Sequence, residues 1–516
     1  MATVPLRSSA GKWIMVSTIL ASSMAFIDAT ALNVVLPSLQ KSLKATGTDL
    51  FWILNAYLLM LASLMLIGGA MGDKLGRKKI FMVGIFIFIT ASAACGTSAS
   101  VLLLVVFRVL QGVGGALMIP GSLSLISSSI NTNERGKAIG TWSAFTTLLI
   151  LGGPILGGAL ADAGLWRYIF FINVPIGIIT LFMLAFRVKE TRDEGSNRAL
   201  DFPGAITIAL GLAFLTFGFL RIPAVGFNII QVIGSLAAGV LFLFAFIIIE
   251  IKSDHPMMPL KLFANATFSG ANLLTFFLYA GLGAGMLFLS LNLVQVQGYS
   301  QLQSGLTFLP FTVLMISIAR YAGSLADKYG PRLFLIGGPA LAGTGMLILS
   351  FIKQTNGPAD YWTTFFPGVL VLGLGMSFTV APLTATVMGS VSDHFSGTAS
   401  GINNAMTRIS GVFANAIFGA LAILLFSGAL QQQINPIPLN SQDKQAIMQQ
   451  AANLGNAKVP PNIIAADKPI IEKAYHTGFI AAYAGIMRIS AGLGFLGALM
   501  AVGFIWNKGL TKAKGD

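Results

Sequence analysis

The chain has 516 residues, of which 55% are hydrophobic and only 10% are charged, and its mean hydropathy is +0.80. A soluble protein carries roughly 25% charged residues, so this composition excludes a soluble globular protein and indicates one that crosses a membrane many times. The formal charge of +14 would suggest a nucleic-acid partner in a soluble chain, but here the basic residues lie in short loops, which excludes that partner and points to membrane topology and the lipid bilayer.

Apolar runs of roughly 20 residues, each long enough to cross the hydrocarbon core, recur along the whole chain. We predict an all-α integral membrane protein with about fourteen transmembrane helices. They lie near residues 14–37, 50–71, 80–98, 101–124, 137–160, 168–187, 203–220, 229–249, 267–291, 303–326, 333–352, 363–388, 399–426 and 478–506. An even number of spans puts both ends of the chain on one side, and the loops of that side, together with the two tails, hold most of the Lys and Arg. The pattern predicts two cytoplasmic termini and a place in the inner (plasma) membrane.

The first apolar run has some features of a secretory signal peptide. Arg7 and Lys12 precede it, and the small residues 29–31 are typical of a cleavage site. The run nevertheless contains Asp28 and continues to Pro37, and many equally long runs follow it. We therefore predict a first membrane helix, with a cleaved signal peptide as the alternative.

A charged turn rich in glycine follows the second span, where residues 68–79 read GGAMGDKLGRKK. Glycines let two helices approach closely, while the acid and the basic cluster stay in water at the membrane face. The segment resembles the signature loop between helices 2 and 3 of the major facilitator superfamily. This resemblance implies a role in conformational switching for Gly69, Gly72, Asp73 and Arg77. The alternative is a loop that is basic only for topology.

An internal repeat indicates how the spans are organised. Residues 323–332 read GSLADKYGPR and echo the first motif, with Asp327 matching Asp73. In a duplicated bundle of six helices per half, the motif after helix 2 should recur after helix 8, but here it recurs after helix 10. We therefore predict two pseudo-symmetric six-helix bundles with two inserted helices. The predicted domains are residues 1–198, the insert at 199–262, and residues 263–516 with an outer loop at 427–477.

Three further motifs extend the resemblance over nearly the whole chain. Residues 28–37 (DATALNVVLP) and 108–116 (RVLQGVGGA) look like the helix-1 and helix-4 motifs of the fourteen-span drug/proton antiporters, a multidrug-efflux family. Residues 153–158 (GPILGG) resemble the helix-5 motif shared by antiporters, with Leu149 where that pattern usually begins with Gly. Its key residues are Gly153, Pro154, Gly157 and Gly158. The same spacing suits any kinked, closely packed helix, so packing alone is the alternative.

Asp28 is the only carboxylate that we place deep in a span. A lone acid in hydrocarbon costs at least ~2.5 kcal/mol, so it should face water or a cation. With a rise of about 1.5 Å per residue, Asp28 lies roughly 13 Å below the outer end of its helix and Arg108 roughly 10 Å below the outer end of helix 4. Their depths match, and we predict a proton switch made by this pair. The alternative is a permanent structural ion pair.

Several other polar residues within the spans are candidates for lining a substrate cavity. They are Asn33, Gln111, Asn403, Asn404, Arg408 and Arg488. Arg408 and Arg488 have no acidic partner in the spans of the carboxyl-terminal half, so the interior is predicted to be net positive and to favour anionic, zwitterionic or neutral lipophiles. The alternative is that both guanidinium groups are satisfied by carbonyl groups and amides.

The outer loop at 427–477 is the one sizeable polar segment. Ser441 could cap a short helix with Ile447, Ala451 and Leu454 on one face, and Gly455 could end it. That helix could lie on the membrane surface or over the cavity mouth. An insertion without a role is the alternative.

Together these features predict a proton-coupled secondary transporter that exports amphipathic drugs or lipophilic compounds across the inner membrane. An exporter of a lipid or lipophilic metabolite is the alternative, and a non-transport membrane protein is a distant one. The sequence shows no metal cluster, nucleophile–base set, cofactor loop or phosphate-binding loop, so no enzymatic activity, cofactor or metal is predicted. The expected partners are a small amphipathic substrate and protons. We expect a monomer, and a periplasmic adaptor is left open.

Overall fold

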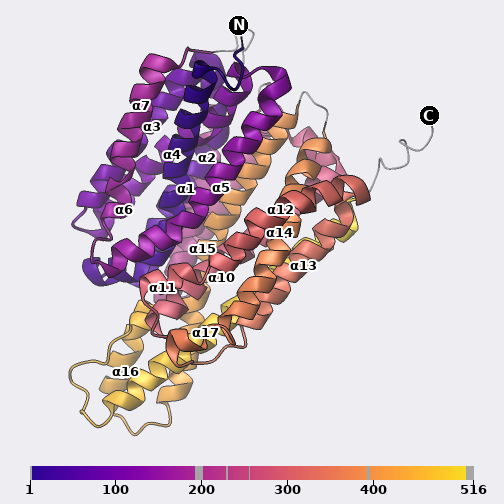
Figure 1. The fold of residues 1–516 in the computed structure, drawn as a ribbon. Coiled ribbons are helices and arrows are strands. Elements are labelled where there is room, and N and C mark those ends of the chain that lie inside the picture. The colour runs from indigo at the N-terminus through magenta and orange to yellow at the C-terminus, as the bar shows by residue number, and fades with distance from the viewer. Residues whose placement is uncertain (1–2, 192–200, 228–229, 255, 392–394, 507–516) are drawn as a thin grey trace.

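The computed structural model describes residues 3–191, 201–227, 230–254, 256–391 and 395–506. Within these ranges every extended regular element is a helix, and the helices gather into two bundles (Figure 1). Thirteen segments of the described chain are long and apolar enough to cross a membrane. The helix α5 has 31 residues and coincides with the predicted fifth span. The predicted all-α membrane fold is confirmed.

The first bundle contains the first six predicted spans. Its helices are α1 (Ser9–Leu43), α2 (Gly47–Leu75), α3 (Arg77–Thr97), α4 (Val101–Ser129), α5 (Thr132–Asp162), α6 (Tyr168–Phe171) and α7 (Asn173–Arg187). The sixth span is broken at Ile172 into α6 and α7. Polar residues begin the first two helices: the Ser8 side chain caps α1, and Thr46 and Asp49 form a reciprocal capping box on α2.

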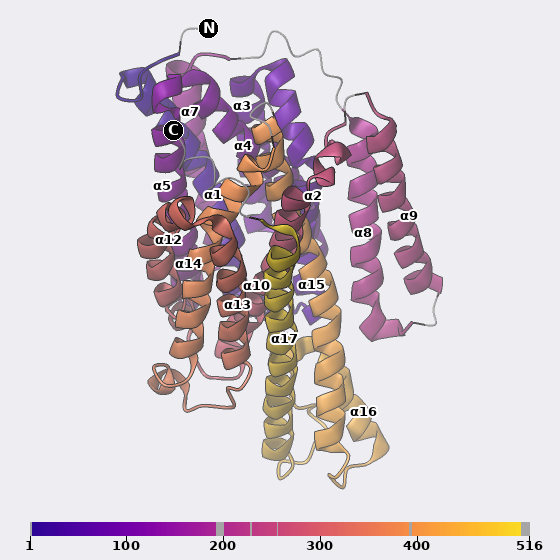
Figure 2. The same cartoon turned by 90° about the vertical axis from the view of Figure 1, so that its right-hand side faces the viewer.

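The two inserted helices are α8 (Phe202–Val225) and α9 (Ile230–Lys252). They pack against each other at the side of the two bundles (Figure 2). The helix α8 packs against α2 and also against α15 (Ser396–Ile434) of the second bundle. The predicted domain boundary at 198 lies outside the described residues, and the one at 262 falls in the 3₁₀ helix η1 (Leu260–Ala264).

The second bundle is formed by the remaining helices. They are α10 (Ala266–Gln295), α11 (Gln301–Leu306), α12 (Leu309–Tyr329), α13 (Pro331–Leu349), η2 (Gly357–Asp360), α14 (Phe365–Gly389), α15, α16 (Ser441–Gln449), η4 (Gln450–Asn456) and α17 (Lys468–Phe504). With 39 and 37 residues, α15 and α17 are longer than predicted. At 1.5 Å per residue both exceed the ~30 Å hydrocarbon core, and they project beyond the bundles to carry α16 (Figure 1).

The internal repeat is visible in the backbone at two equivalent glycines. Gly76 ends α2 and begins α3 with φ of 115°, and Gly330 ends α12 and begins α13 with φ of 88°. Residues with side chains rarely adopt a positive φ, so glycine is needed at both corners. The predicted relation between the two halves is confirmed at this point.

The short helix of the outer loop differs in detail from the prediction. Asn440, not Ser441, caps α16 by accepting a hydrogen bond from the backbone of Asp443. Ile447, Ala451 and Leu454 are buried as expected. The positive φ belongs to Leu454 at 54° rather than to Gly455, and η4 continues to Asn456. Burial of the apolar face therefore determines the backbone conformation at the end of this helix more strongly than the position of the glycine does.

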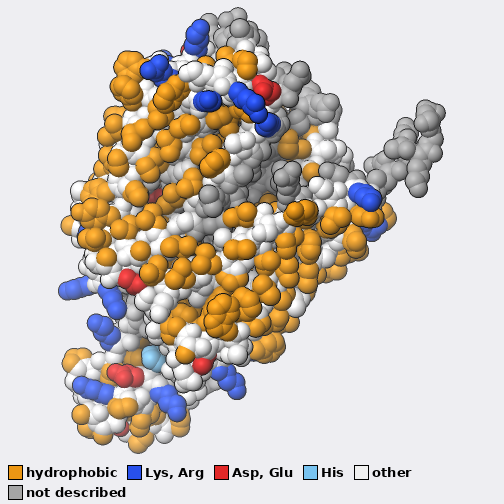
Figure 3. Space-filling view, viewed as in Figure 1, with side chains coloured by type: hydrophobic (Ala, Val, Ile, Leu, Met, Phe, Trp, Pro, Cys, Tyr) orange, Lys and Arg blue, Asp and Glu red, His pale blue; other side chains and the backbone are white. Residues whose placement is uncertain are grey.

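The outer surface has the distribution of side chains expected of a membrane protein. Hydrophobic side chains cover the flanks of both bundles, while Lys and Arg gather toward the ends (Figure 3). Apolar side chains on the flanks can contact lipid tails without a free-energy penalty, whereas charged side chains remain in the headgroup region or in water.

Candidate functional site

Three polar side chains meet inside the first bundle. Arg108 of α4 forms an ion pair through Nη1 with Oδ2 of Asp28 on α1, and it donates a hydrogen bond to Oε1 of Gln111 at 2.8 Å. Gln111 in turn donates from Nε2 to Oδ1 of Asp28 at 3.0 Å. Asp28 and Gln111 are 0% exposed and Arg108 is 1% exposed. Both carboxylate oxygens are therefore partnered in a site that excludes water.

The guanidinium group of Arg108 has further neighbours on α2. Its Nε donates to the carbonyl oxygen of Ile53 at 3.4 Å, and its central carbon lies 4.4 Å from the centre of the Tyr57 ring. The single cysteine, Cys95 of α3, is buried with its Sγ 3.8 Å from Gln111 Oε1. Sequence reasoning identified Asp28, Arg108 and Gln111 but missed Tyr57, whose mid-span position next to the helix-4 motif becomes visible only in three dimensions.

A glycine of the helix-4 motif explains the close contact between α4 and α2. A Cβ atom on Gly112 would lie 2.5 Å from the carbonyl oxygen of Tyr57, which is closer than any side chain tolerates. The missing side chain lets the two helices approach, and the approach places Tyr57 beneath Arg108.

The helix-5 motif packs α5 against two different partners. A Cβ atom on Gly157 would lie 2.7 Å from the carbonyl oxygen of Ala31 on α1, and Gly153 faces Thr30 of the same helix. On the opposite bundle, a Cβ atom on Gly158 would lie 2.5 Å from the carbonyl oxygen of Gln301 in α11. The motif thus holds α5 to the helix of Asp28 and also to the second bundle. Pro154 lies inside α5 between these contacts.

The predicted cavity residues separate into different environments. Asn403 of α15 donates to Thr275 Oγ1 at 2.7 Å and to Asn272 Oδ1 at 3.2 Å, both on α10. Asn404 is exposed and bonds to its own helix. Asn33 is half-buried, and its carbonyl oxygen accepts a long hydrogen bond of 3.5 Å from Ser290 of the second bundle.

The two predicted cavity arginines do not lie together. Arg408 is half-buried on α15, and its guanidinium carbon lies 5.8 Å from the ring centre of Phe26 on α1. Arg488 is exposed on α17, 5.8 Å from the ring of the exposed Phe351, and shares an outward face with Leu499. We therefore correct the sequence-based assignment of Arg488 to the cavity, because its helical face is turned away from the other bundle.

The loop at residues 68–79, called the switching loop after its predicted role, forms its contacts within the first bundle. Asp73 accepts a hydrogen bond from Arg77 Nε at 2.7 Å and one from Ser124 Oγ at 3.3 Å. A Cβ atom on Gly69 would be in ordinary contact with Pro120 at 3.6 Å, so Gly69 faces α4. Gly72 is buried in the last turns of α2, where its carbonyl oxygen accepts the N–H of the corner glycine. The side chain of Asp327, from the repeat, lies outside the described residues.

Glu190 was not singled out from the sequence, yet it organises the switching loop. Its carboxylate accepts hydrogen bonds from the backbone N–H groups of Lys78 at 2.9 Å and Lys79 at 3.0 Å, which are free donors at the start of α3. A Cβ atom on Gly76 would lie 2.9 Å from its carboxyl carbon. The signal available in the sequence was an acid in the charged linker after α7.

Hydrogen bonds between the two bundles gather in the half of the molecule farther from the termini. Asp162 at the end of α5 accepts the backbone N–H groups of Gln301 at 2.8 Å and Leu302 at 2.9 Å. Gln40 near the end of α1 bonds to Gln295 of α10 at 3.1 Å. These contacts join the two bundles, so this conformation is closed at the end away from the termini.

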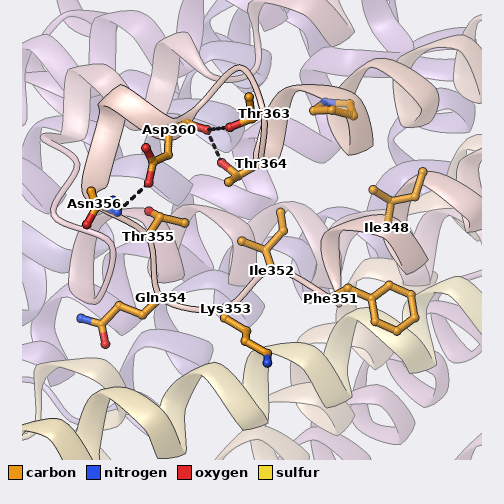
Figure 4. A pocket seen from close by; sticks show the side chains of 11 residues that line it. Ile348, Phe351, Ile352, Lys353, Gln354, Thr355, Asn356, Asp360, Thr363 and Thr364 are labelled. Atoms are coloured by element: carbon orange, nitrogen blue, oxygen red, sulfur yellow. Dashed lines mark hydrogen bonds between the residues drawn. The ribbon is translucent and has the colours of Figure 1, made fainter.

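A surface cavity of about 510 Å³ lies between the ends of α13 and α14, next to η2 (Figure 4). Its lining includes Phe351, Lys353 and Asp360, and the Asp360 carboxylate accepts the backbone N–H of Asn356 at 2.9 Å. It contains none of the predicted site residues. Among the described residues, no group of three His, Cys, Asp or Glu side chains could hold a metal ion.

Comparison with known families assigns the chain. The model of the Major Facilitator Superfamily matches residues 18–415, which is more than half of the chain. The chain belongs to the major facilitator superfamily. Its match begins in α1 before Asp28 and ends in α15 after Arg408, so it covers both bundle centres.

The similar proteins include several named for resistance and export. The tetracenomycin C resistance and export protein of Streptomyces glaucescens is 31% identical over 398 residues, which cover 77% of this chain and 73% of that protein. The methylenomycin A resistance protein of Bacillus subtilis is 30% identical over 80% of this chain and 88% of its own length. A puromycin resistance protein of Streptomyces alboniger is 30% identical, with 82% and 85% covered.

Solved structures agree on the fold. A bacterial homologue of the human lysosomal transporter Spinster, in an inward-facing and unoccupied conformation, matches with a TM-score of 0.63 at 17% identity, covering 97% of this chain and 100% of that chain. The inward-open xylose transporter of E. coli matches with a TM-score of 0.56 at 14% identity, with 97% of each chain covered. At these identities the likeness establishes the superfamily fold alone.

Proposed function

We propose that this protein is a proton-coupled secondary transporter that exports amphipathic or lipophilic drug-like compounds across the plasma membrane. The observation that carries the proposal is the buried network of Asp28, Arg108 and Gln111, which places an acid and its counter-charge in the dry interior of a polytopic fold. The similarity to resistance and export proteins supports efflux as the direction of transport.

Proton binding at Asp28 would change this network in a defined way. A neutral carboxyl group no longer attracts Arg108, whose charge then lies without a counter-ion in the interior. Two unit charges at 4 Å interact by about 4 kcal/mol at an effective dielectric constant of 20. A two-state equilibrium moves from 1:99 to 99:1 with about 5.5 kcal/mol, so one protonation supplies most of what a conformational switch needs.

The helix-5 motif offers a mechanical route from the acid to the bundle interface. Gly153 and Gly157 lie against residues 30–31 of α1, directly after Asp28 and within one helical turn of it, and Gly158 lies against α11 of the second bundle. A shift of α1 on protonation would therefore be transmitted through α5 to its contact with the second bundle. Alternating access then consists of opening the inter-bundle contacts at one end while the other end closes.

The switching loop is proposed to stabilise one of the two states. Asp73 and Arg77 pair at 2.7 Å on the membrane face, with Asp73 still 40% exposed and so able to change partners. Gly69 faces Pro120 of α4, and Gly72 faces Arg77 at the start of α3. We assign the same role to Asp327 by the internal repeat. The proposal places both termini in the cytoplasm, with the protein acting as a monomer on a small substrate.

The test is transport by the purified protein in proteoliposomes with an imposed pH gradient, screened over dyes, detergents and lipids. The expected result is substrate movement against its gradient that stops when a protonophore dissipates the pH difference. Liposomes without protein are the control. Transport that proceeds at the same rate and to the same level with and without the pH gradient would contradict proton coupling.

A further inference from the structure

The described part of the second bundle holds a cation, Arg408, that forms no ion pair there. Arg408 is half-buried on α15 and directs its guanidinium group at the ring of Phe26 in the other bundle. Two tyrosines, Tyr57 and Tyr279, interact with its charge, and a tyrosine side chain carries no negative charge at neutral pH. In the described ranges it has no ion pair. The contrast with Arg108, which is neutralised by Asp28, leaves the centre of the molecule net positive.

An unpaired charge deep in the membrane is energetically unfavourable unless a ligand of opposite charge binds to it. A central Arg in a transmembrane helix is unfavourable, and a cation–π contact offsets only part of that cost. Resting on the proposed export function, we propose that Arg408 binds an acidic group of the exported compound, a carboxylate, sulfonate or phosphate carried on an aromatic or apolar body. The Phe26 ring, whose centre is 5.8 Å from the guanidinium carbon, would contact that body.

The test uses three compounds that share one aromatic body and differ only in carrying a carboxylate, a carboxamide or a trimethylammonium group. Equilibrium binding is measured for wild type, Arg408→Lys, Arg408→Gln and the control Arg488→Gln. Wild type is expected to prefer the carboxylate about tenfold over the amide, as one well-formed charge-assisted hydrogen bond predicts. Arg408→Gln should lose this preference, Arg408→Lys should keep part of it, and Arg488→Gln should leave it unchanged.

The outcomes separate this inference from the proposed function. If wild type prefers the trimethylammonium compound and Arg408→Gln does not alter the ranking, the role of Arg408 is wrong while proton-coupled export stands. If the carboxylate preference is found but no compound moves in response to a pH gradient, the anion site stands and the proposed function fails. Retained binding of the amide by Arg408→Gln shows that the variant is folded.

A second proposal concerns the polar segment between α15 and α17. The outer cap, residues 431–467, contains α16 and η4 and stands on the projecting ends of α15 and α17 (Figure 2). It is held to the second bundle by buried apolar residues that include Ile447 and Leu454, and by a hydrogen bond from Tyr475 Oη to the carbonyl oxygen of Ile447 at 3.3 Å. The cap is thus a packed part of the second bundle.

The cap also reaches the first bundle, and one side chain there makes several hydrogen bonds. Gln40 at the end of α1 donates to the carbonyl oxygen of Asn453 at 3.1 Å and accepts from Asn456 Nδ2 at 2.7 Å. Its Oε1 also accepts from Gln295 of α10 at 3.1 Å. Gln40 is 4% exposed, so its amide is satisfied by the second bundle rather than by water.

The neighbouring backbone is strained at the point of docking. Leu454 is fully buried with φ of 54° and ψ of −135°, a conformation that residues with side chains rarely adopt. The space for it is made by Gly47 at the start of α2, where a Cβ atom would lie 3.0 Å from Leu454 Cδ1 and 2.8 Å from the carbonyl oxygen of Ala452.

The geometry points to a latch. The outer cap closes the end away from the termini by binding Gln40 and Gly47 of the first bundle, and it must release them before that end opens. Release breaks the hydrogen bonds of Gln40, which costs free energy. It also relieves the backbone strain at Leu454, which lowers the free energy and offsets part of that cost. Such compensation suits a contact that forms and breaks in every cycle.

Reversible crosslinking tests the latch. The single cysteine is first replaced by Cys95→Ser, and the pair Gln40→Cys with Asn456→Cys is joined by a short bis-methanethiosulfonate reagent. Transport should fall by about tenfold or more on crosslinking, since the closed state is then held by a covalent bond, and it should return on reduction. The control pair Asn435→Cys with Lys444→Cys joins two residues on the second-bundle side and should leave transport unchanged.

Recovery on reduction excludes misfolding as the reason for the loss. If the protein crosslinked between residues 40 and 456 transports as fast as the reduced protein, the cap does not need to leave the first bundle and the latch is wrong. Equal inhibition by the control pair would likewise contradict it, because stiffening of the cap alone would then account for the effect.

Discussion

The centres of the two bundles each contain an arginine on a helix lined with polar residues, but the two are satisfied differently. Arg108 is fully enclosed and meets a carboxylate, an amide, a carbonyl group and an aromatic ring. Arg408 is half-buried, lies near the ring of Phe26 from the opposite bundle, and forms no ion pair among the described residues. One site is complete within its own bundle, whereas the other ends at the interface between bundles.

From this difference we infer that the first bundle binds the proton and the second binds the substrate. A complete network responds when one of its own members changes charge, which is what a proton does to Asp28. An incomplete one responds to a ligand that arrives from outside, which is what a substrate does at Arg408. The two sites lie in helices that face each other, because Phe26 is only two residues from Asp28.

The same substitution should destabilise the protein in the first bundle but not in the second, and this is the largest effect that we expect. Arg108→Gln leaves the buried Asp28 carboxylate without its cation and should lower the free energy of unfolding by about 3–5 kcal/mol. Arg408→Gln removes an unpaired charge and should not lower it. Thermal unfolding of both variants in the same detergent measures the difference. Equal destabilisation would show that Arg408 has structural partners after all.

A second variant distinguishes the lost pair from local misfolding. Adding Asp28→Asn to Arg108→Gln removes the orphaned charge, so the double variant should recover most of the lost stability. It should not recover uphill transport. A double variant as unstable as Arg108→Gln alone would mean that packing, rather than charge, explains the loss.

The helix-5 motif gives an intermediate effect. Gly157→Ala introduces a Cβ atom 2.7 Å from the carbonyl oxygen of Ala31 and should cost roughly 1–3 kcal/mol while slowing transport. Gly152→Ala is the matched control, because its Cβ atom would meet nothing within 4 Å. A gain in helix propensity makes that variant neutral or slightly stabilising. If both variants behave alike, the close approach of α5 to α1 is not what the motif provides.

The smallest effect on stability is expected at the switching loop. Asp73 is 40% exposed, and an exposed ion pair is worth about 0–1 kcal/mol, so Asp73→Ala should unfold nearly as wild type does. We expect turnover to fall several-fold while substrate affinity stays the same, since the loop lies outside the bundle centres. Separate measurements of affinity and transport rate check this. Normal turnover with weakened binding would place Asp73 at the substrate instead.

The parts of the site that follow from sequence are those fixed by periodicity and depth. The depths of Asp28 and Arg108 could be computed from helical rise alone, and the structure joins them as predicted. The glycines at 76 and 330 could be matched by their motifs, and both adopt the positive φ that their corners require.

The parts that did not follow depend on the rotation of helices and on contacts between distant segments. The depth of Arg488 was readable but its outward face was not, because a single helix does not reveal which side its neighbours cover. Glu190 and Gln40 act only through backbone groups far away in the chain. Leu454 shows the same limit, since its backbone is set by burial against α2 rather than by local propensity.

The most direct test of the account compares two transport modes in Asp28→Asn proteoliposomes. The neutral amide mimics a permanently protonated carboxyl group and cannot exchange a proton, so the variant should lose accumulation driven by a pH gradient. Because the rest of the cavity is unchanged, it should still exchange labelled for unlabelled substrate when no gradient is present. Loss of the first mode with retention of the second is the predicted result. Accumulation by Asp28→Asn at the wild-type rate would contradict the claim that Asp28 couples transport to protons.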